Sequence, residues 1–113
     1  MEEKTGQSLD LIVAHDILRR HQGSLVSKRD GFVVVKLRQA NETWLLWIRS
    51  SPVTSNALAL WSKLVARHSF DKAFLVKTSD RADYVSYQDL ERSGLEVVNL
   101  KDIEDLLTAQ SSQ

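Results

Sequence analysis

Two acidic residues and a lysine could form a metal-dependent catalytic site around residues 31 to 50, GFVVVKLRQANETWLLWIRS. Asp30 and Glu42 flank the two apolar runs of this segment, and Lys36 lies in the first of them. Carboxylates are the ligands that Mg²⁺ prefers, and a nearby lysine assists attack by a metal-activated water. Both acids lie in predicted turns, however, where acidic side chains are commonly solvated. We favour the solvated interpretation and keep Asp30, Glu42 and Lys36 as an alternative catalytic site.

The other polar residues form no second catalytic pattern. The absence of cysteine excludes disulfides, thiolate zinc sites and cysteine nucleophiles. His15, His21 and His68 do not have the spacing of metal ligands. Asp10 and Asp16 could add a metal ligand from the first predicted helix, but we expect both on a solvated helix face. We therefore predict no metal and no other cofactor, and Mg²⁺ is required only by the alternative site.

The composition is typical of one globular domain, with 113 residues of which 42% are hydrophobic and 27% charged. No apolar run is long enough to span a membrane, and the N-terminus lacks a secretory pattern, so we expect an intracellular protein, cytoplasmic or nuclear. The net charge is zero, but residues 1–69 hold ten Lys or Arg against six Asp or Glu, and residues 70–113 hold five against nine. The fold could carry a basic face and an acidic face, or an ordinary mixture of surface charges.

Nine elements are predicted between polar tails at residues 1–7 and 110–113, in a single domain of residues 8–109. Apolar residues at helical spacing predict helices over 8–22, 54–68, 83–93 and 99–109. Runs of β-branched and aromatic residues predict strands over 24–27, 31–38, 43–50, 70–77 and 95–98. The order α-β-β-β-α-β-α-β-α predicts an α/β fold with a mixed central sheet and helices on both faces.

Three stretches resemble the PD-(D/E)XK, or restriction-endonuclease-like, fold, in particular its Mrr-type and Holliday-junction-resolvase-like branch. ALALWSKLVARHSFDKAFLVKTSD is similar to the helix, polar turn and Thr/Ser-ended strand of that branch. YVSYQDLERSGLEVVNLKDIEDLL is similar to its following helix, short strand and closing helix. The helix over 8–22 and the strands after it resemble the opening of the domain. Together the three stretches cover nearly the whole chain.

The resemblance implies a metal site whose ligands are missing from this sequence. In such families an acid lies on the second strand, and an acid or Gln, followed two residues later by Lys, lies on the third. The matching positions here are Val33 or Val34, Trp47 and Arg49. Val and Trp cannot bind Mg²⁺, and Arg49 stays protonated, which makes it a poor proton carrier. The resemblance therefore predicts a nuclease-like domain with a degenerate catalytic motif.

A second resemblance is to the C-terminal domain of tRNA-splicing endonuclease subunits, over WSKLVARHSFDKAFLVKTSDRADYVSY. That family uses a Tyr, a His and a Lys without a metal, and His68, Lys72 and Tyr87 lie in the similar stretch. The closing segment GLEVVNLKDIEDLL fits the first family better. A structural subunit of this second kind is kept as an alternative.

Basic residues near the predicted meander make nucleic acid a candidate partner, with DNA favoured over RNA. We predict phosphate contacts from Lys28, Arg29, Lys36, Arg38 and Arg49. Lys36 and Arg38 face the same side of their strand, because side chains alternate along a strand. The same charges could instead prevent exposed strand edges from pairing with strands of other chains.

Trp44 and Trp47 are candidates for a surface that binds a partner protein. Their odd separation places them on opposite faces of one strand, one in the core and the other exposed or under a helix. The function expected from these features is a non-catalytic nucleic-acid-binding or scaffolding subunit, in a DNA-repair or nucleic-acid-processing complex. We expect a protein partner or a homo-oligomer and no membrane. The alternatives are a pure protein-interaction subunit and an active Mg²⁺-dependent endonuclease.

Overall fold

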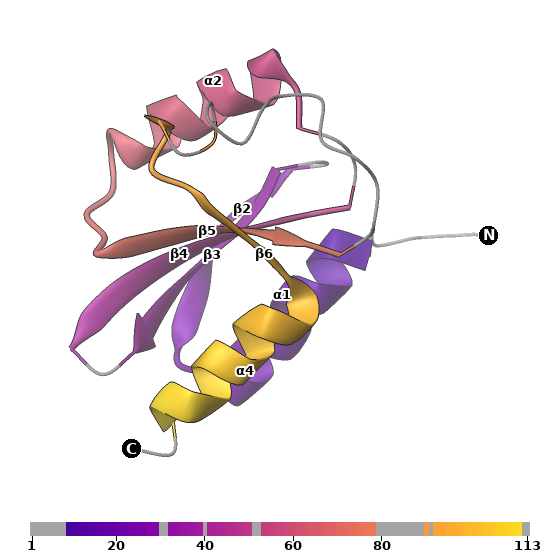
Figure 1. Cartoon of the computed structure of the whole chain (residues 1–113), viewed down its shortest axis with the longest axis vertical. Helices are drawn as coiled ribbons and strands as arrows, with labels where there is room; N and C mark the ends of the chain where they lie inside the picture. The colour runs from indigo at the N-terminus through magenta and orange to yellow at the C-terminus, as the bar shows by residue number, and fades with distance from the viewer. Residues whose placement is uncertain are drawn as a thin grey trace.

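The computed structural model describes residues 9–29, 32–39, 41–50, 53–78, 90 and 92–111. Within them, a five-stranded mixed sheet has the order β2-β3-β4-β5-β6. The strands are β2 (Gly23–Arg29), β3 (Phe32–Gln39), β4 (Glu42–Arg49), β5 (Lys72–Lys77) and β6 (Glu96–Asn99). Helices α1 (Leu9–Arg20) and α4 (Leu100–Ser111) lie on one face of the sheet, and α2 (Ser55–Val65) lies on the other (Figure 1). The predicted α/β class, with a mixed sheet between helices, is confirmed.

The strand directions give the sheet two different ends. β2, β3 and β4 form an antiparallel meander, and β5 and β6 continue the sheet in parallel with β4. The parallel step from β4 to β5 requires a crossover, which α2 provides. We call the end where β4, β5 and β6 finish, at Arg49, Lys77 and Asn99, the carboxyl end of the sheet. The opposite end is the amino end.

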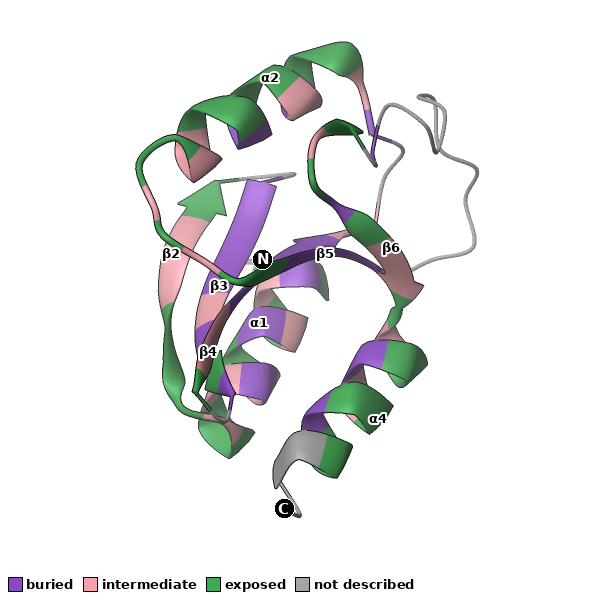
Figure 2. Cartoon of the chain, turned by 60° about the vertical axis from the view of Figure 1, so that its left-hand side comes forward, coloured by how far each residue is buried: buried purple, intermediate pink, exposed green. Residues whose placement is uncertain are grey.

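Each face of the sheet is buried in its own hydrophobic core (Figure 2). The core under α1 and α4 contains Ala14, Ile17, Val33, Val35, Leu37, Trp44, Leu46, Ile48, Phe74, Val76, Ile103 and Leu107. The core under α2 contains Phe32, Val34, Leu45, Trp47, Val53, Ala57, Trp61, Ala73, Leu75, Leu90 and Leu95. Alternate residues of a strand enter alternate cores, which explains why the apolar runs of β3 and β4 are continuous.

All three tryptophans are core residues. Trp44 has an exposed fraction of 1%, and Trp47 and Trp61 of 0%. Trp44 and Trp47 do face opposite sides of β4, as predicted, but a helix covers each of them. The prediction that one of them forms an exposed partner-binding surface is wrong, because a sheet covered on both faces leaves no face of its central strand to solvent.

Capping contacts explain where α2 and α4 begin. The Thr54 hydroxyl accepts a hydrogen bond from the N–H of Ala57 at 3.2 Å, and the Asn99 side-chain oxygen accepts one from the N–H of Asp102 at 2.8 Å. Both contacts satisfy a backbone donor that has no partner within its helix. α4 continues to Ser111, two residues past its predicted end at residue 109.

Several predicted features fall outside the described residues, namely the N-terminal tail, the turn at Asp30 and Gly31, and most of the helix predicted over 83–93. The predicted end of that helix is described. Gly94 has a φ of 78°, and the N–H of Leu95 donates to the carbonyl oxygen of Leu90 at 3.1 Å, which is the geometry of a glycine-terminated helix. In the described part of the chain, no helix is long and apolar enough to cross a membrane.

Gly23 is required where β2 begins against β3. A Cβ atom at this position would lie 2.6 Å from Cδ2 of Leu37 and would also overlap the carbonyl oxygen of Lys36. Because that oxygen belongs to the backbone of β3, we expect Gly23→Ala to lower the free energy of unfolding by about 1–3 kcal/mol. Urea denaturation measures the change, with Ser24→Ala at the next, exposed position as the control. Equal stability of the two variants would contradict the prediction.

Candidate nucleic-acid interface

Three cations form a row across the carboxyl end of the sheet. Arg29 pairs with Phe32, and Arg49 pairs with Lys77. Val33 pairs with Ile48, which places Phe32 and Arg49 at the next positions of the same antiparallel register. Neighbouring strands lie about 4.8 Å apart, so the row of Arg29, Arg49 and Lys77 spans about 14 Å. We call these three residues the basic row.

The basic row points to the face that α2 covers. Side chains that pair across strands project to the same face, and Phe32 belongs to the core under α2. Arg29 is exposed, whereas Arg49 and Lys77 are half-buried. The guanidinium carbon of Arg49 lies 5.8 Å from the centroid of the Trp47 ring, within the range of a cation–π contact. The core of the α2 face therefore helps to position a charge at the end of the sheet.

Three helices begin at this same end. α2 starts after Thr54, which follows β4, and α4 starts directly after Asn99 at the end of β6. Asp10 lies in the first turn of α1, beside Thr78, which follows β5. A helix N-terminus carries a partial positive charge and unpaired N–H groups that suit an anion. Asp10 offsets this effect for α1, and Asp102 offsets it for α4, which also lies on the opposite face. The first turn of α2 contains no acidic residue, so the dipole of α2 adds to the charge on the face of the basic row.

Asp10 is buried at the carboxyl end, on the face opposite the basic row. Its exposed fraction is 3%, and its Oδ1 accepts a hydrogen bond from the Thr78 hydroxyl at 3.2 Å. The prediction of a solvated helix face is wrong for Asp10, because the first turn of α1 packs against the end of β5. The signal in the sequence is the spacing of Asp10, Ala14 and Ile17, which share the buried side of α1.

The solvated interpretation holds for Asp16, farther along the same helix. This carboxylate is partly exposed and forms ion pairs of 2.9 Å with both Arg19 and Arg20. Arg20 also lies 3.4 Å from Glu104 of α4, which links the two helices on this face. Asp16 therefore belongs to a surface charge network, and the carboxyl end of the sheet gains no second carboxylate from α1.

The alternative site of Asp30, Glu42 and Lys36 is not assembled by the described residues. Glu42 pairs with Gln39, at the far end of β3 from Phe32, and seven residues of strand span about 23 Å. Asp30, which precedes Phe32 by two positions, lies outside the described residues. Because Glu42 lies at the amino end of the sheet, its carboxylate does not approach the end of β3 at Phe32.

Glu42 has partners of its own at the amino end. Its Oε1 accepts a hydrogen bond from Nε1 of Trp44 at 3.0 Å and lies 3.5 Å from Nζ of Lys72. Lys36 pairs with Leu45, about three residues along the hairpin from Glu42. Over the described ranges, no three His, Cys, Asp or Glu residues gather in a way that could hold a metal ion.

The positions that the nuclease resemblance assigns to metal ligands are core positions. Val33, Val34 and Trp47 are all buried, Val33 in the core under α1 and α4 and the other two in the core under α2. Trp47 stacks on Trp61, with ring centroids 5.6 Å apart and an interplanar angle of 8°. These side chains hold the helices on the sheet, and they offer a metal no ligand.

The predicted phosphate-binding residues are only partly brought together. Lys36 pairs with Leu45 and Arg38 with Thr43, so both share the face of the basic row but lie toward the amino end. Lys28 pairs with Val33 and points to the opposite face. Lys77 is not among the residues predicted from the sequence. It joins the row because the parallel register sets β5 beside β4, and spacing along the chain does not reveal that register.

The residues of the splicing-endonuclease resemblance lie elsewhere. His68 follows α2, and Lys72 begins β5 at the amino end, with its Nζ 5.3 Å from the centroid of the Trp44 ring. Tyr87 lies outside the described residues. No family model, curated protein or solved structure matches the chain. The basic row is therefore a candidate site by its own geometry.

The hydrogen bond between Thr78 and Asp10 ties α1 to the carboxyl end of the sheet. Thr78→Val keeps the side-chain shape but removes the hydroxyl donor, which leaves a buried carboxyl oxygen without this partner. We expect the free energy of unfolding to fall by about 1–3 kcal/mol in thermal or urea denaturation. Thr78→Ser, which keeps the hydroxyl, is the control. A valine variant as stable as the serine variant would show that the bond contributes nothing.

Proposed function

We propose that this chain is a non-catalytic, restriction-endonuclease-like domain that binds nucleic acid at the carboxyl end of its sheet. The observation that carries the proposal is the basic row, in which Arg29, Arg49 and Lys77 come from three different strands and project to one face. A nucleic-acid strand carries one phosphate per about 3.4 Å of helix axis, so a row about 14 Å long can face several phosphates.

The arrangement of elements supports the nuclease-like part of the proposal. A helix, an antiparallel meander, a crossover helix and a parallel strand follow one another, which is the order that the resemblance implies. In open α/β sheets, ligands commonly bind at the carboxyl ends of the strands. The basic row lies at this end, and DNA is the favoured ligand because the resemblance is to DNA-cleaving families.

The apolar residues at the expected ligand positions support binding without cleavage. Val33, Val34 and Trp47 provide no carboxylate for Mg²⁺, and the permanent charge of Arg49 suits contact with phosphate better than proton transfer. Phosphate contacts fix the position of a protein on nucleic acid but carry no sequence information. The proposed role is therefore a binding or scaffolding subunit with little sequence preference, in a DNA-repair or nucleic-acid-processing complex.

Salt dependence and a single substitution test the basic row. Fluorescence anisotropy with a labelled DNA duplex, between 50 and 200 mM salt, should give an affinity that falls with salt at a log–log slope of about −3, if three phosphates are contacted. Arg29→Gln should weaken binding about three- to tenfold and reduce the slope by about one. Lys63→Gln, on the exposed side of α2 near its C-terminal end, makes the same charge change outside the row and should leave binding unchanged.

Three outcomes would contradict the proposal in different ways. Equal losses for Arg29→Gln and Lys63→Gln would show a general charge effect and no role for the row. Mg²⁺-dependent cleavage that disappears in Asp30→Ala would establish the active nuclease instead. Absence of binding to duplex DNA, single-stranded DNA and duplex RNA alike would leave the protein-interaction alternative.

A further inference from the structure

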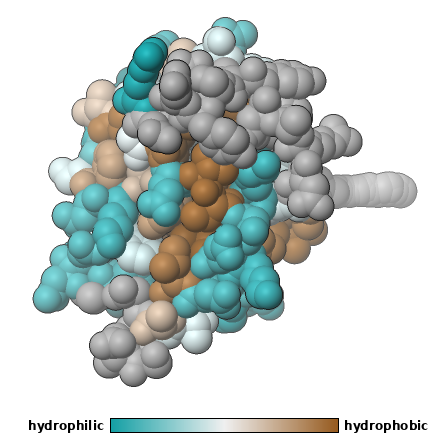
Figure 3. Space-filling model, in the orientation of Figure 1, coloured by the Kyte–Doolittle hydropathy of each residue, from teal (hydrophilic) through white to brown (hydrophobic). Residues whose placement is uncertain are grey.

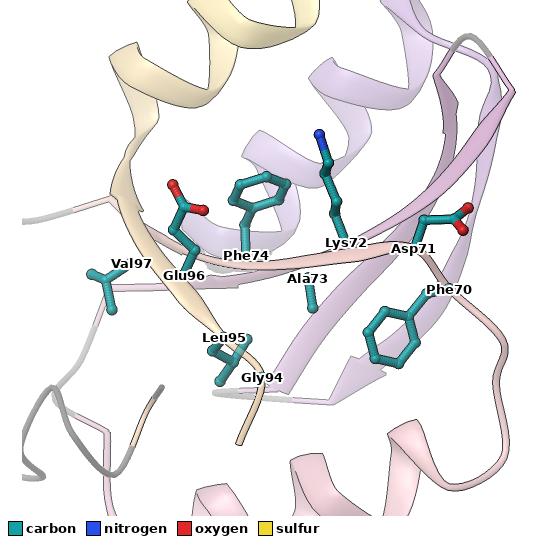
Figure 4. Close-up of a pocket in the computed structure, with 9 residues that line it drawn as sticks. All are labelled: Phe70, Asp71, Lys72, Ala73, Phe74, Gly94, Leu95, Glu96 and Val97. Atoms are coloured by element: carbon teal, nitrogen blue, oxygen red, sulfur yellow. The ribbon is translucent and has the colours of Figure 1, made fainter. Parts of the chain in front are cut away.

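A groove of about 650 Å³ opens at the amino end of the sheet, at the opposite end from the basic row. The parallel pairing of β5 with β6 begins only at Phe74 and Glu96. The groove lies before this point, between the start of β5 and the segment that leads into β6. Residues 70–74 form one wall and residues 94–97 form the other (Figure 4).

The interior of the groove is apolar. Phe70, Ala73 and Leu95 point toward α2, and Phe74 points toward α1 and α4 (Figure 4). Ala73, Phe74 and Leu95 are buried members of the two cores, and Phe70 is half-buried against one of them. The groove therefore reaches the edge of both cores and offers contact surface for an apolar side chain.

The rim of the groove is acidic. The carboxylates of Asp71 and Glu96 and the ammonium group of Lys72 surround it (Figure 4). Nζ of Lys72 is held by Glu42 at 3.5 Å and lies over the Trp44 ring. Oδ2 of Asp71 accepts a hydrogen bond from the N–H of Thr43 at 2.7 Å, and Asp71 and Glu96 are both exposed. The lining thus holds two carboxylates and one ammonium group, and that ammonium group is already paired with Glu42, which leaves the rim negatively charged.

The groove leads onto the outer edge of β6. In the described sheet, β6 is the last strand and pairs only with β5. Its Val97 and Val98 are half-buried, and Figure 3 shows a hydrophobic band over this strand between hydrophilic flanks. A strand edge of this kind can accept an extended segment as a further strand, with backbone hydrogen bonds for affinity and side-chain pockets for specificity.

We propose that the groove and β6 form a docking site for an extended, cationic segment of a partner protein. One apolar side chain of the segment occupies the groove, and neighbouring lysines or arginines face Glu96 and Asp71. Charge complementarity selects this occupant, because the acidic rim favours a basic segment and disfavours nucleic acid. The proposal does not depend on nucleic-acid binding, which is assigned to the other end of the sheet.

A second copy of this chain is a poorer occupant. Pairing of β6 with its own copy would join two negatively charged rims, and the juxtaposition of like charges is unfavourable. The basic edge strand β2 has complementary charge but contains a register shift between Leu25 and Ser27. Such a bulge impedes the addition of another strand. A partner segment has neither obstacle.

The test is an NMR titration of ¹⁵N-labelled protein with designed peptides. The probe is a capped peptide in which valine and lysine alternate, and two matched peptides replace either the lysines by glutamate or the valines by serine. We expect the Val–Lys peptide to shift the amide signals of Ala73, Glu96 and Val97 but not that of Arg29. Both matched peptides should bind at least about tenfold more weakly. The glutamate peptide loses the attraction to the acidic rim, and the serine peptide loses the apolar side chain that occupies the groove.

Two protein variants separate a specific site from general attraction. Glu96→Lys should weaken binding of the Val–Lys peptide about tenfold, since it replaces an attraction by a repulsion. Asp105→Lys makes the same change at an exposed position of α4 that does not line the groove, and it should alter affinity less than about twofold. Equal effects of the two variants, shifts confined to other surfaces, or no shifts at millimolar peptide would overturn the proposal, whatever the result with DNA.

Discussion

Burial of β4 from both sides is the constraint on which the rest of the structure depends. Trp44, Leu46 and Ile48 enter the core under α1 and α4, and Leu45 and Trp47 enter the core under α2. Each fully buried large apolar side chain contributes about 1.5–3 kcal/mol, so this one strand supplies much of the hydrophobic stabilisation. The stack of Trp47 on Trp61 fixes α2 over the sheet, and the edge contact of Phe32 with Trp47 at 5.3 Å fixes β3 beside them.

The same constraint accounts for the apolar residues at Val34 and Trp47, which the proposed resemblance aligns with metal ligands. A carboxylate at Val34 or Trp47 would be buried among aromatic and aliphatic side chains, where an uncompensated charge is costly. Apolar residues at these positions instead complete the core on which α2 packs. The polar groups at the carboxyl end are displaced to the margins of that core, with the basic row on the α2 face and the pair of Asp10 and Thr78 on the other face.

The fold also separates charge along and across the sheet. β2 and β3 carry four basic and no acidic residues, whereas β6 and α4 carry four acidic residues and one lysine. Because the sheet order places β2 and β6 at opposite edges, the charge asymmetry between the two halves of the sequence becomes an asymmetry between two sides of the molecule. The proposed anionic ligand and the proposed cationic segment each have a charge opposite to that of the side to which they are assigned.

The sequence by itself determined the types of the eight described elements, the α/β class and the opposite placement of Trp44 and Trp47, because these follow from local spacing, capping and alternation along one strand. It also identified Arg29 and Arg49 as candidate ligands for phosphate. Only the tertiary structure decided that Lys77 completes the basic row, that Asp10 is buried against Thr78, that Glu42 lies far from the start of β3, and that a groove opens beside β6. Each of these depends on which strands pair, in which register and under which helix, and such contacts join residues whose separation in the chain carries no local signal.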